Sequence, residues 1–178
     1  MKTGLFCCLC ITFFDAGGKI SKIISIGGLK WGKVEMFIGE YEHNLDAKGR
    51  LAIPAKFRNS LSSGAVVTRG LDRCLFVFTG EEWENLAQKI SALPMTAANA
   101  RAFSRLMLSG ASECEIDSQG RVLIPDYLRK YAGLEKNIVL AGVYSRIEIW
   151  DSKAWNEYKT RTEAESDRIA EQMTDLGI

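Results

Sequence analysis

The sequence is poor in the residues that most often build metal and catalytic sites. His43 is the only histidine among 178 residues, and three of the five cysteines lie within the first ten positions. Because Cys74 and Cys114 are isolated, the odd number and irregular spacing give neither a disulfide framework nor a pair of zinc-binding Cys-x-x-Cys units. We therefore expect a reduced, cytoplasmic setting, with no bound metal and no cofactor.

Long hydrophobic runs are also missing. The apolar run from Leu5 to Phe14 is shorter than the roughly 20 residues that a membrane-spanning helix needs. A convincing small-x-small cleavage site does not follow it. We expect residues 1–35 to be an upstream extension produced from an early start codon, with Met36 as the natural start, and we expect no membrane association.

The chain also lacks a strong net charge of either sign. The net charge is only +1, and residues 1–35 contribute +3 of it, from five lysines against Asp15 and Glu35. Residues 36–178 therefore carry −2. Any affinity for nucleic acid must come from a local basic patch rather than from the whole chain.

Recognised catalytic patterns are lacking as well. The sequence has no nucleophile elbow and no glycine-rich phosphate loop, and it offers only generic carboxylates such as Glu113 and Glu115. We expect a protein that is not an enzyme and has no small-molecule substrate.

What the sequence does have is an internal repeat. The stretch Asp46–Arg58 returns in altered form as Asp117–Arg129, with six identical positions that are each 71 residues apart. The identical pairs are Asp46 and Asp117, Gly49 and Gly120, Arg50 and Arg121, Ile53 and Ile124, Pro54 and Pro125, and Arg58 and Arg129.

Each copy predicts a turn, a strand and a short helix. Asp46 and Asp117 suit the start of a tight turn, where their side chains accept backbone N–H groups, and Gly49 and Gly120 supply the positive φ. The next four residues are apolar-rich and favour a strand. A proline then ends the strand and suits the first position of a helix.

The flanking segments extend the correspondence. We expect strands over 37–45, 65–70, 74–78, 138–143 and 146–150, and a helical segment over 97–108. Thr79-Gly-Glu-Glu82 is a capping box, and Asp151 is the matching N-cap in the second copy. Trp83 and Trp155 follow at equivalent positions, and the spacing of Trp83, Leu86, Ala87 and Ile90 predicts that Trp83 packs in the core.

One such unit is too small to bury a core, so two units are expected to combine. The resulting fold is mainly β with flanking helices, an α+β protein with pseudo-two-fold symmetry, built as a small barrel of interleaved hairpins. The expected domain limits are 1–35 for the extension, 36–92 for the first repeat, 93–110 for a helical connector, 111–158 for the second repeat and 159–178 for a charged helical tail.

The motif Asp-x-x-Gly-Arg-(Val/Leu)-x-Ile-Pro-x-x-(Phe/Leu)-Arg resembles the signature of the AbrB-type swapped-hairpin DNA-binding fold. Two copies in one chain resemble the MraZ family of bacterial transcriptional regulators, and the likeness runs from Met36 to about Tyr158. Residues 1–35 have no counterpart in it.

The resemblance implies a swapped-hairpin β-barrel of two tandem AbrB-like repeats. It also implies a cytoplasmic, nucleoid-associated regulator of the division and cell-wall gene cluster, acting as a homo-oligomeric ring on tandem repeats in double-stranded promoter DNA. Family members contact DNA through the Asp-x-x-x-Arg motif, a role that carries over to Asp46 with Arg50 and to Asp117 with Arg121.

The residues themselves point to a basic patch in the first copy. Four cations lie within eleven positions there, and arginine suits bidentate contact with guanine while lysine suits phosphate. Because Gln119 and Tyr127 replace the two lysines in the second copy, we expect the first copy to dominate contact with DNA. The predicted DNA-binding residues are Lys48, Arg50, Lys56, Arg58, Arg121 and Arg129.

Two alternatives remain at this point. Asp and Arg four positions apart around a glycine turn also suit an ion pair that only fixes the hairpin. At the level of the whole chain, the repeats also suit an oligomeric protein-interaction module without direct DNA contact.

Overall fold

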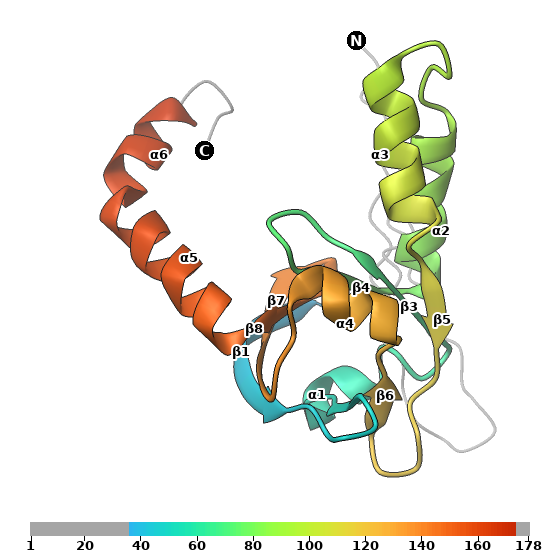
Figure 1. Ribbon diagram of the computed structural model, residues 1–178, viewed down its shortest axis with the longest axis vertical. Helices are drawn as coiled ribbons and strands as arrows, with labels where there is room; N and C mark the ends of the chain where they lie inside the picture. Colours follow the sequence, from blue (N-terminus) through green and yellow to red (C-terminus); the bar gives the residue numbers. More distant parts are fainter. Residues whose placement is uncertain (1–35, 174–178) are drawn as a thin grey trace, which may run out of the picture. The chain divides into compact units, whose positions relative to one another are not determined.

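The computed structural model describes residues 36–173, so the expected extension at 1–35 lies outside the described residues. The helices and strands follow one another in the same order in both halves of the chain (Figure 1). The first half contains β1 (Phe37–Asn44), β2 (Arg50–Ala52), α1 (Ala55–Arg58), β3 (Ala65–Arg69), β4 (Leu75–Thr79), α2 (Gly80–Ser91) and α3 (Ala98–Leu108). The second contains β5 (Ser112–Cys114), β6 (Arg121–Leu123), α4 (Asp126–Ala132), β7 (Asn137–Tyr144), β8 (Arg146–Asp151), α5 (Ser152–Ala164) and α6 (Ser166–Gln172).

Six strands form one antiparallel sheet in the order β1-β7-β8-β4-β3-β5. The counterparts in the two repeats are β1 and β5, β3 and β7, and β4 and β8. Exchanging each strand for its counterpart gives the same strand order, counted from the other edge of the sheet. A pseudo-two-fold axis therefore passes between β4 and β8. Because β1 pairs with β7 and β5 with β3, each repeat completes the sheet of the other.

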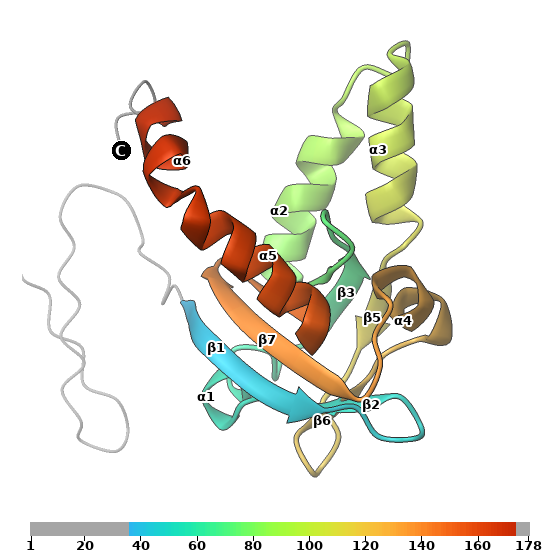
Figure 2. The same cartoon turned by 60° about the vertical axis from the view of Figure 1, so that its left-hand side comes forward.

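The remaining strands, β2 and β6, pair with each other as a two-stranded ribbon. Two reciprocal hydrogen bonds join the repeats at its ends: Ile53 N–H donates to Gly120 O at 2.9 Å, and Ile124 N–H donates to Gly49 O at 2.8 Å. Figure 2 shows the ribbon and its two turns together at one end of the described part of the chain.

The sheet buries side chains on both faces. One face packs against the ribbon, α1 and α4, with Leu51, Val122, Phe57 and Leu128 in the core. The opposite face carries Phe76, Phe78, Val139 and Trp150 and packs against α2, α3 and α5. This double coverage explains why the central strands read as nearly continuous apolar runs.

Both predicted N-cap residues are confirmed, but among the described residues the Glu82 carboxylate makes no return bond to Thr79 N–H, so the capping box is only half formed. The Thr79 hydroxyl accepts a hydrogen bond from Glu82 N–H at 3.2 Å, and Asp151 accepts one from Lys153 N–H at 3.0 Å. Asp151 is itself buried, and its other carboxylate oxygen accepts from Glu135 N–H. Each cap therefore fixes where a helix leaves the sheet. Trp83 packs against the second core cluster as predicted, but it lies half-buried at its margin.

The mainly β architecture with flanking helices and two repeats is confirmed. The strands do not close into a hydrogen-bonded barrel, because the end strands β1 and β5 have no ladder between them. The ribbon closes the core instead, through the side chains of Leu51 and Val122. Within residues 36–173, no helix combines the length and the apolar character that crossing a membrane requires. The domain limits expected from the sequence stay a prediction.

The two ends of the sheet differ. β1 has eight residues, whereas β5 has three, because residues 108–110, at the end of α3 and in the turn after it, stand where the second repeat would begin a strand like β1. The end of α3 is attached to the sheet by the fully buried Thr68, whose hydroxyl donates to Met107 O at 2.6 Å. The pseudo-symmetry is therefore broken on the α3 side.

Candidate nucleic-acid interface

The first turn is held by the Asp46 carboxylate. One carboxylate oxygen accepts the backbone N–H groups of Lys48 and Arg50, each at 2.9 Å, and the other accepts Arg50 Nε at 2.7 Å. The donated backbone hydrogen bond of Arg50 is the main reason that the pKa of Asp46 lies below its ordinary value. Asp46 is therefore ionised at neutral pH and orients the Arg50 side chain.

The second turn repeats this arrangement with one more bond. Asp117 accepts the backbone N–H groups of Gln119 and Arg121 at 2.9 and 3.0 Å. Its second oxygen accepts both Nε and Nη2 of Arg121, at 2.9 and 2.7 Å. The side-chain hydrogen bonds of Arg121, followed by that of its backbone N–H, lower the pKa of Asp117 to about 2. Arg121 is thus held by two nitrogens and Arg50 by one.

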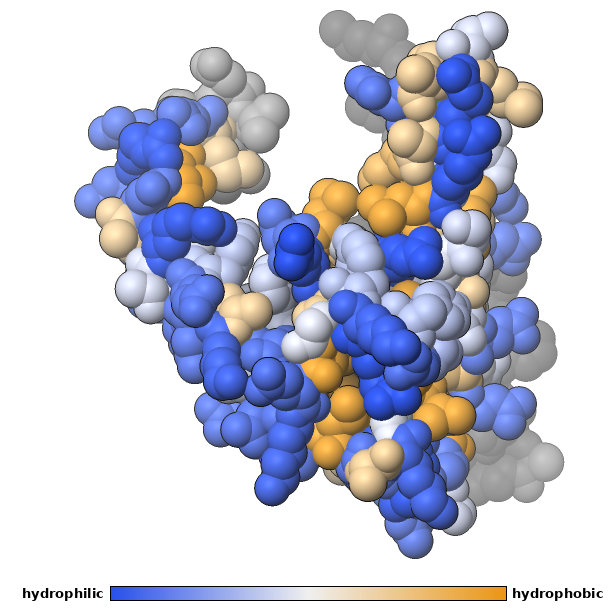
Figure 3. Space-filling model, viewed as in Figure 1, coloured by the Kyte–Doolittle hydropathy of each residue, from blue (hydrophilic) through white to orange (hydrophobic). Residues whose placement is uncertain are grey.

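The ribbon displays both arginines on one face. Leu51 pairs with Val122, and both side chains are fully buried, so the neighbouring pairs point away from the core. Those pairs are Arg50 with Leu123 and Ala52 with Arg121. The arginine side chains are 33% and 24% exposed. Figure 3 shows hydrophilic side chains at this end of the described residues, with smaller apolar groups beside them.

Arg58 and Arg129 lie elsewhere and make contacts that join the repeats. Their Nε atoms donate to Ile53 O at 2.8 Å and to Ile124 O at 3.1 Å. The Arg58 guanidinium lies against Gly120, in the turn of the other repeat, and the Arg129 guanidinium lies against Gly49. Each arginine therefore supports the turn across the pseudo-two-fold axis. Their predicted DNA contacts stay a prediction.

The two lysines of the first copy also separate. Lys56 Nζ donates to Ile38 O and lies 4.7 Å from the centroid of the Tyr41 ring, so it faces β1 rather than the ribbon. Lys48 is exposed at the turn, and among residues 36–173 its ammonium group has no ion-pair partner. The structure thus brings Lys48, Arg50 and Arg121 to the ribbon end and places Lys56 apart.

Sequence reasoning missed Leu123, a large apolar side chain on the ribbon face beside Arg50. It is 57% exposed. The signal was available in the alternation of the strand: Val122 and Ile124 of the repeated motif must point inward, so the residue between them must point outward. We define the ribbon face as Lys48, Arg50, Ala52, Arg121 and Leu123.

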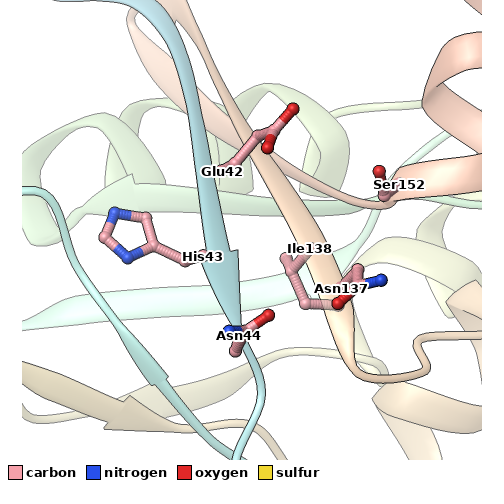
Figure 4. A pocket seen from close by; sticks show the side chains of 6 residues that line it. All are labelled: Glu42, His43, Asn44, Asn137, Ile138 and Ser152. Atoms are coloured by element: carbon pink, nitrogen blue, oxygen red, sulfur yellow. The ribbon is translucent and has the colours of Figure 1, made fainter.

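A separate polar pocket of about 360 Å³ lies where β1, β7 and the start of α5 meet. Figure 4 shows His43 on one side of β1 and Glu42 on the other, so these side chains do not converge on one point. Burial of the imidazole, with the Arg58 charge nearby, lowers the pKa of His43, which leaves it neutral at pH 7. In the described part of the chain no three metal-ligating side chains cluster.

Comparison with known proteins agrees with the tandem arrangement. The model of the MraZ protein family matches residues 36–106 and again residues 107–177. The chain belongs to the MraZ family. The resemblance drawn from the Asp-x-x-Gly-Arg motif is thereby confirmed.

Individual MraZ relatives are similar over nearly their whole length. A protein of Thermoanaerobacter sp. (strain X514) is 52% identical over 143 residues, which cover 80% of this chain and 100% of the relative. A protein of Halothermothrix orenii is 53% identical over the same shares, and one of Carboxydothermus hydrogenoformans is 54% identical over 79% of this chain and 99% of its own. Each of these relatives is named transcriptional regulator MraZ, which is not the name of an enzyme.

Proposed function

We propose that this chain is a transcriptional regulator that binds double-stranded promoter DNA through the ribbon face. The observation that carries the proposal is the pair of aspartate-held arginines, Arg50 and Arg121, displayed together on the outer face of the two-stranded ribbon. A two-stranded ribbon fits the major groove, where arginine contacts guanine O6 and N7. The names of the relatives support the same function.

The aspartates prepare the arginines for this contact. Asp46 binds only Nε of Arg50, so the two terminal nitrogens of that guanidinium remain available to a guanine edge. Asp117 also binds Nη2 of Arg121, which leaves fewer donors. A side chain held in place loses little freedom on binding, so specific contact costs less entropy. The difference favours Arg50 as the main base-reading arginine.

The finer parts of the proposal concern assembly and target. We propose that several protomers form a ring that binds tandem repeats in the promoter of the division and cell-wall gene cluster, with nucleoid association following from DNA binding. The ribbon face of one protomer is small and the chain is nearly neutral. Linked weak sites raise the effective concentration of each other, so a ring would supply the affinity that one protomer lacks.

An oligomeric protein-interaction module without DNA contact is the second candidate. It is favoured by apolar side chains at the connection between α2 and α3, where Met95 is 80% exposed and Leu93 is 37% exposed. Exposed apolar groups of this kind suit a protein partner. The basic ribbon face has no role in this candidate.

Gel-shift titration with the DNA upstream of the protein's own gene separates the candidates. We expect wild type to bind and Arg50→Ala to bind roughly 5- to 150-fold more weakly, because one good bidentate pair contributes about 1–3 kcal/mol. Arg105→Ala is the matched control, since it removes one exposed charge from α3. Sizing by light scattering shows whether each variant still assembles. Equal binding by Arg50→Ala and wild type would refute the proposed contact.

A further inference from the structure

Leu123 is the one large apolar side chain on the ribbon face. Its counterpart in the first repeat, 71 positions earlier, is Ala52. The face therefore carries a bulky apolar group beside Arg50 and only a methyl group beside Arg121. An exposed leucine between cations is difficult to explain by folding, because its neighbours Val122 and Ile124 supply the core contacts of this strand.

The register places Leu123 directly beside Arg50. At the ribbon ends, Gly49 is hydrogen-bonded to Ile124 and Ile53 to Gly120. Hydrogen-bonded and non-hydrogen-bonded pairs alternate along an antiparallel ladder, so the next pair, Arg50 and Leu123, is not hydrogen-bonded. Side chains approach most closely in pairs of this kind. The Cβ atoms of such a pair are about 4.5–5.5 Å apart. Base pairs stack about 3.4 Å apart, so the two side chains can reach the same or adjacent steps.

We infer that Leu123 is a specificity-determining residue that packs on the C5-methyl group of a thymine next to the base that Arg50 contacts. The inference rests on the proposed DNA-binding function and names a base feature for it. In the major groove only thymine presents a methyl group, and apolar side chains are the groups that read it. The Ala52 side chain reaches less far, so the two ends of the ribbon contact DNA unequally. The end with Arg50 and Leu123 makes the larger contact.

The test compares two duplexes of the DNA upstream of the gene, one with thymine and one with deoxyuridine throughout. Deoxyuridine lacks the methyl group but keeps every hydrogen-bonding group of the base. We expect wild type to bind the deoxyuridine duplex about fourfold more weakly for each methyl group lost from the contact, given about 0.8 kcal/mol per buried methyl or methylene.

Leu123→Ala should remove this discrimination, binding both duplexes equally and the thymine duplex more weakly than wild type does. Leu71→Ala is the matched control, because Leu71 is 51% exposed in the connection between β3 and β4, away from the ribbon. Thermal unfolding checks that each variant folds, and the wild-type comparison stands without any variant. If wild type binds both duplexes equally, the Leu123 contact is refuted while DNA binding stands. If it binds neither, the proposed function itself fails.

Discussion

At the scale of single residues, the two turn glycines show how one position can be constrained twice. Gly120 has φ of 76°, a conformation that side chains rarely adopt, and the Arg58 guanidinium lies where a Cβ atom would stand. Gly49 has φ of 79°, with atoms of the Arg129 guanidinium 2.9 Å from that place. Turn conformation and contact between repeats therefore require the same residue.

Gly120→Ala should lower the free energy of unfolding by about 1–3 kcal/mol, because a strained backbone and a displaced Arg58 act together. Gly80→Ala is the contrasting variant. Gly80 begins α2 with nothing within 4 Å of a Cβ position, so alanine there should stabilise the protein by about 0.4–1 kcal/mol. Urea denaturation of both variants measures the difference, and equal effects of the two substitutions would contradict this account.

Asp117 predicts how stability depends on pH. Its pKa in the folded protein is about 2, below the ordinary value of 3.8, because Arg121 donates hydrogen bonds to the charged form. A depressed carboxyl pKa contributes stability that is fully present above the ordinary pKa and is lost as pH falls through the folded value. The loss should therefore occur between about pH 4 and pH 2.

Thermal unfolding of wild type and Asp117→Asn across that range provides the measurement. The melting temperature of wild type should fall more steeply than that of Asp117→Asn. Asp167→Asn, on α6 and outside both turns, should follow wild type. If Asp117→Asn has the same pH profile as wild type, the ion pair does not contribute to stability.

At the scale of elements, a buried hydroxyl attaches the end of α3 to the sheet. Met107 O belongs to the last turn of α3, where carbonyl groups have no partner within the helix, and Thr68 on β3 supplies the donor. Arg69 adds a longer contact to Leu106 O at 3.5 Å. The helix that precedes the second repeat is thereby attached to β3 of the first.

Thr68→Val keeps the shape of the side chain and removes the donor. We expect it to lower the free energy of unfolding by about 1–3 kcal/mol, since the Met107 carbonyl would lose its buried partner. Thr96→Val at an exposed position between α2 and α3 should change it by less than about 0.5 kcal/mol. Chemical denaturation of the two variants under one condition measures both free energies of unfolding, and equal values would contradict the role of the Thr68 hydroxyl.

The elements were largely predictable because their signals are local. Turn residues, prolines and caps act on a few neighbouring positions, so the strands around both motifs and the starts of α2 and α5 could be predicted from the sequence. The role of each arginine could not. Arg50 and Arg58 lie in one stretch of 13 residues and are chemically identical; only packing between repeats shows that Arg58 meets Gly120 while Arg50 stays on the surface. The open sheet, likewise, depends on pairings between distant strands.

At the scale of the whole molecule, DNA binding by a nearly neutral chain should depend on few charges. We expect the logarithm of the binding constant to fall linearly with the logarithm of salt concentration, with a slope of about −0.9 for each phosphate neutralised. Lys48 has no acidic partner among the described residues, so it is the lysine best placed to contact phosphate.

Lys48→Ala should therefore make the slope shallower by about 0.9 per protomer engaged and weaken binding to specific and non-specific DNA alike. Lys89→Ala, which removes a charge from the last turn of α2, should leave the slope unchanged. Fluorescence anisotropy at a series of salt concentrations provides both slopes. An unchanged slope for Lys48→Ala would place the phosphate contact elsewhere.

The exchange of strands between the repeats also determines when the protein can fold during synthesis. The partner of Phe37 on β1 is Tyr144 on β7, more than 100 positions later in the chain. At a ribosomal rate of about 5–20 residues per second, β1 waits several seconds for the strand that covers it. β1 is therefore the strand whose backbone edge stays unpaired for longest during synthesis.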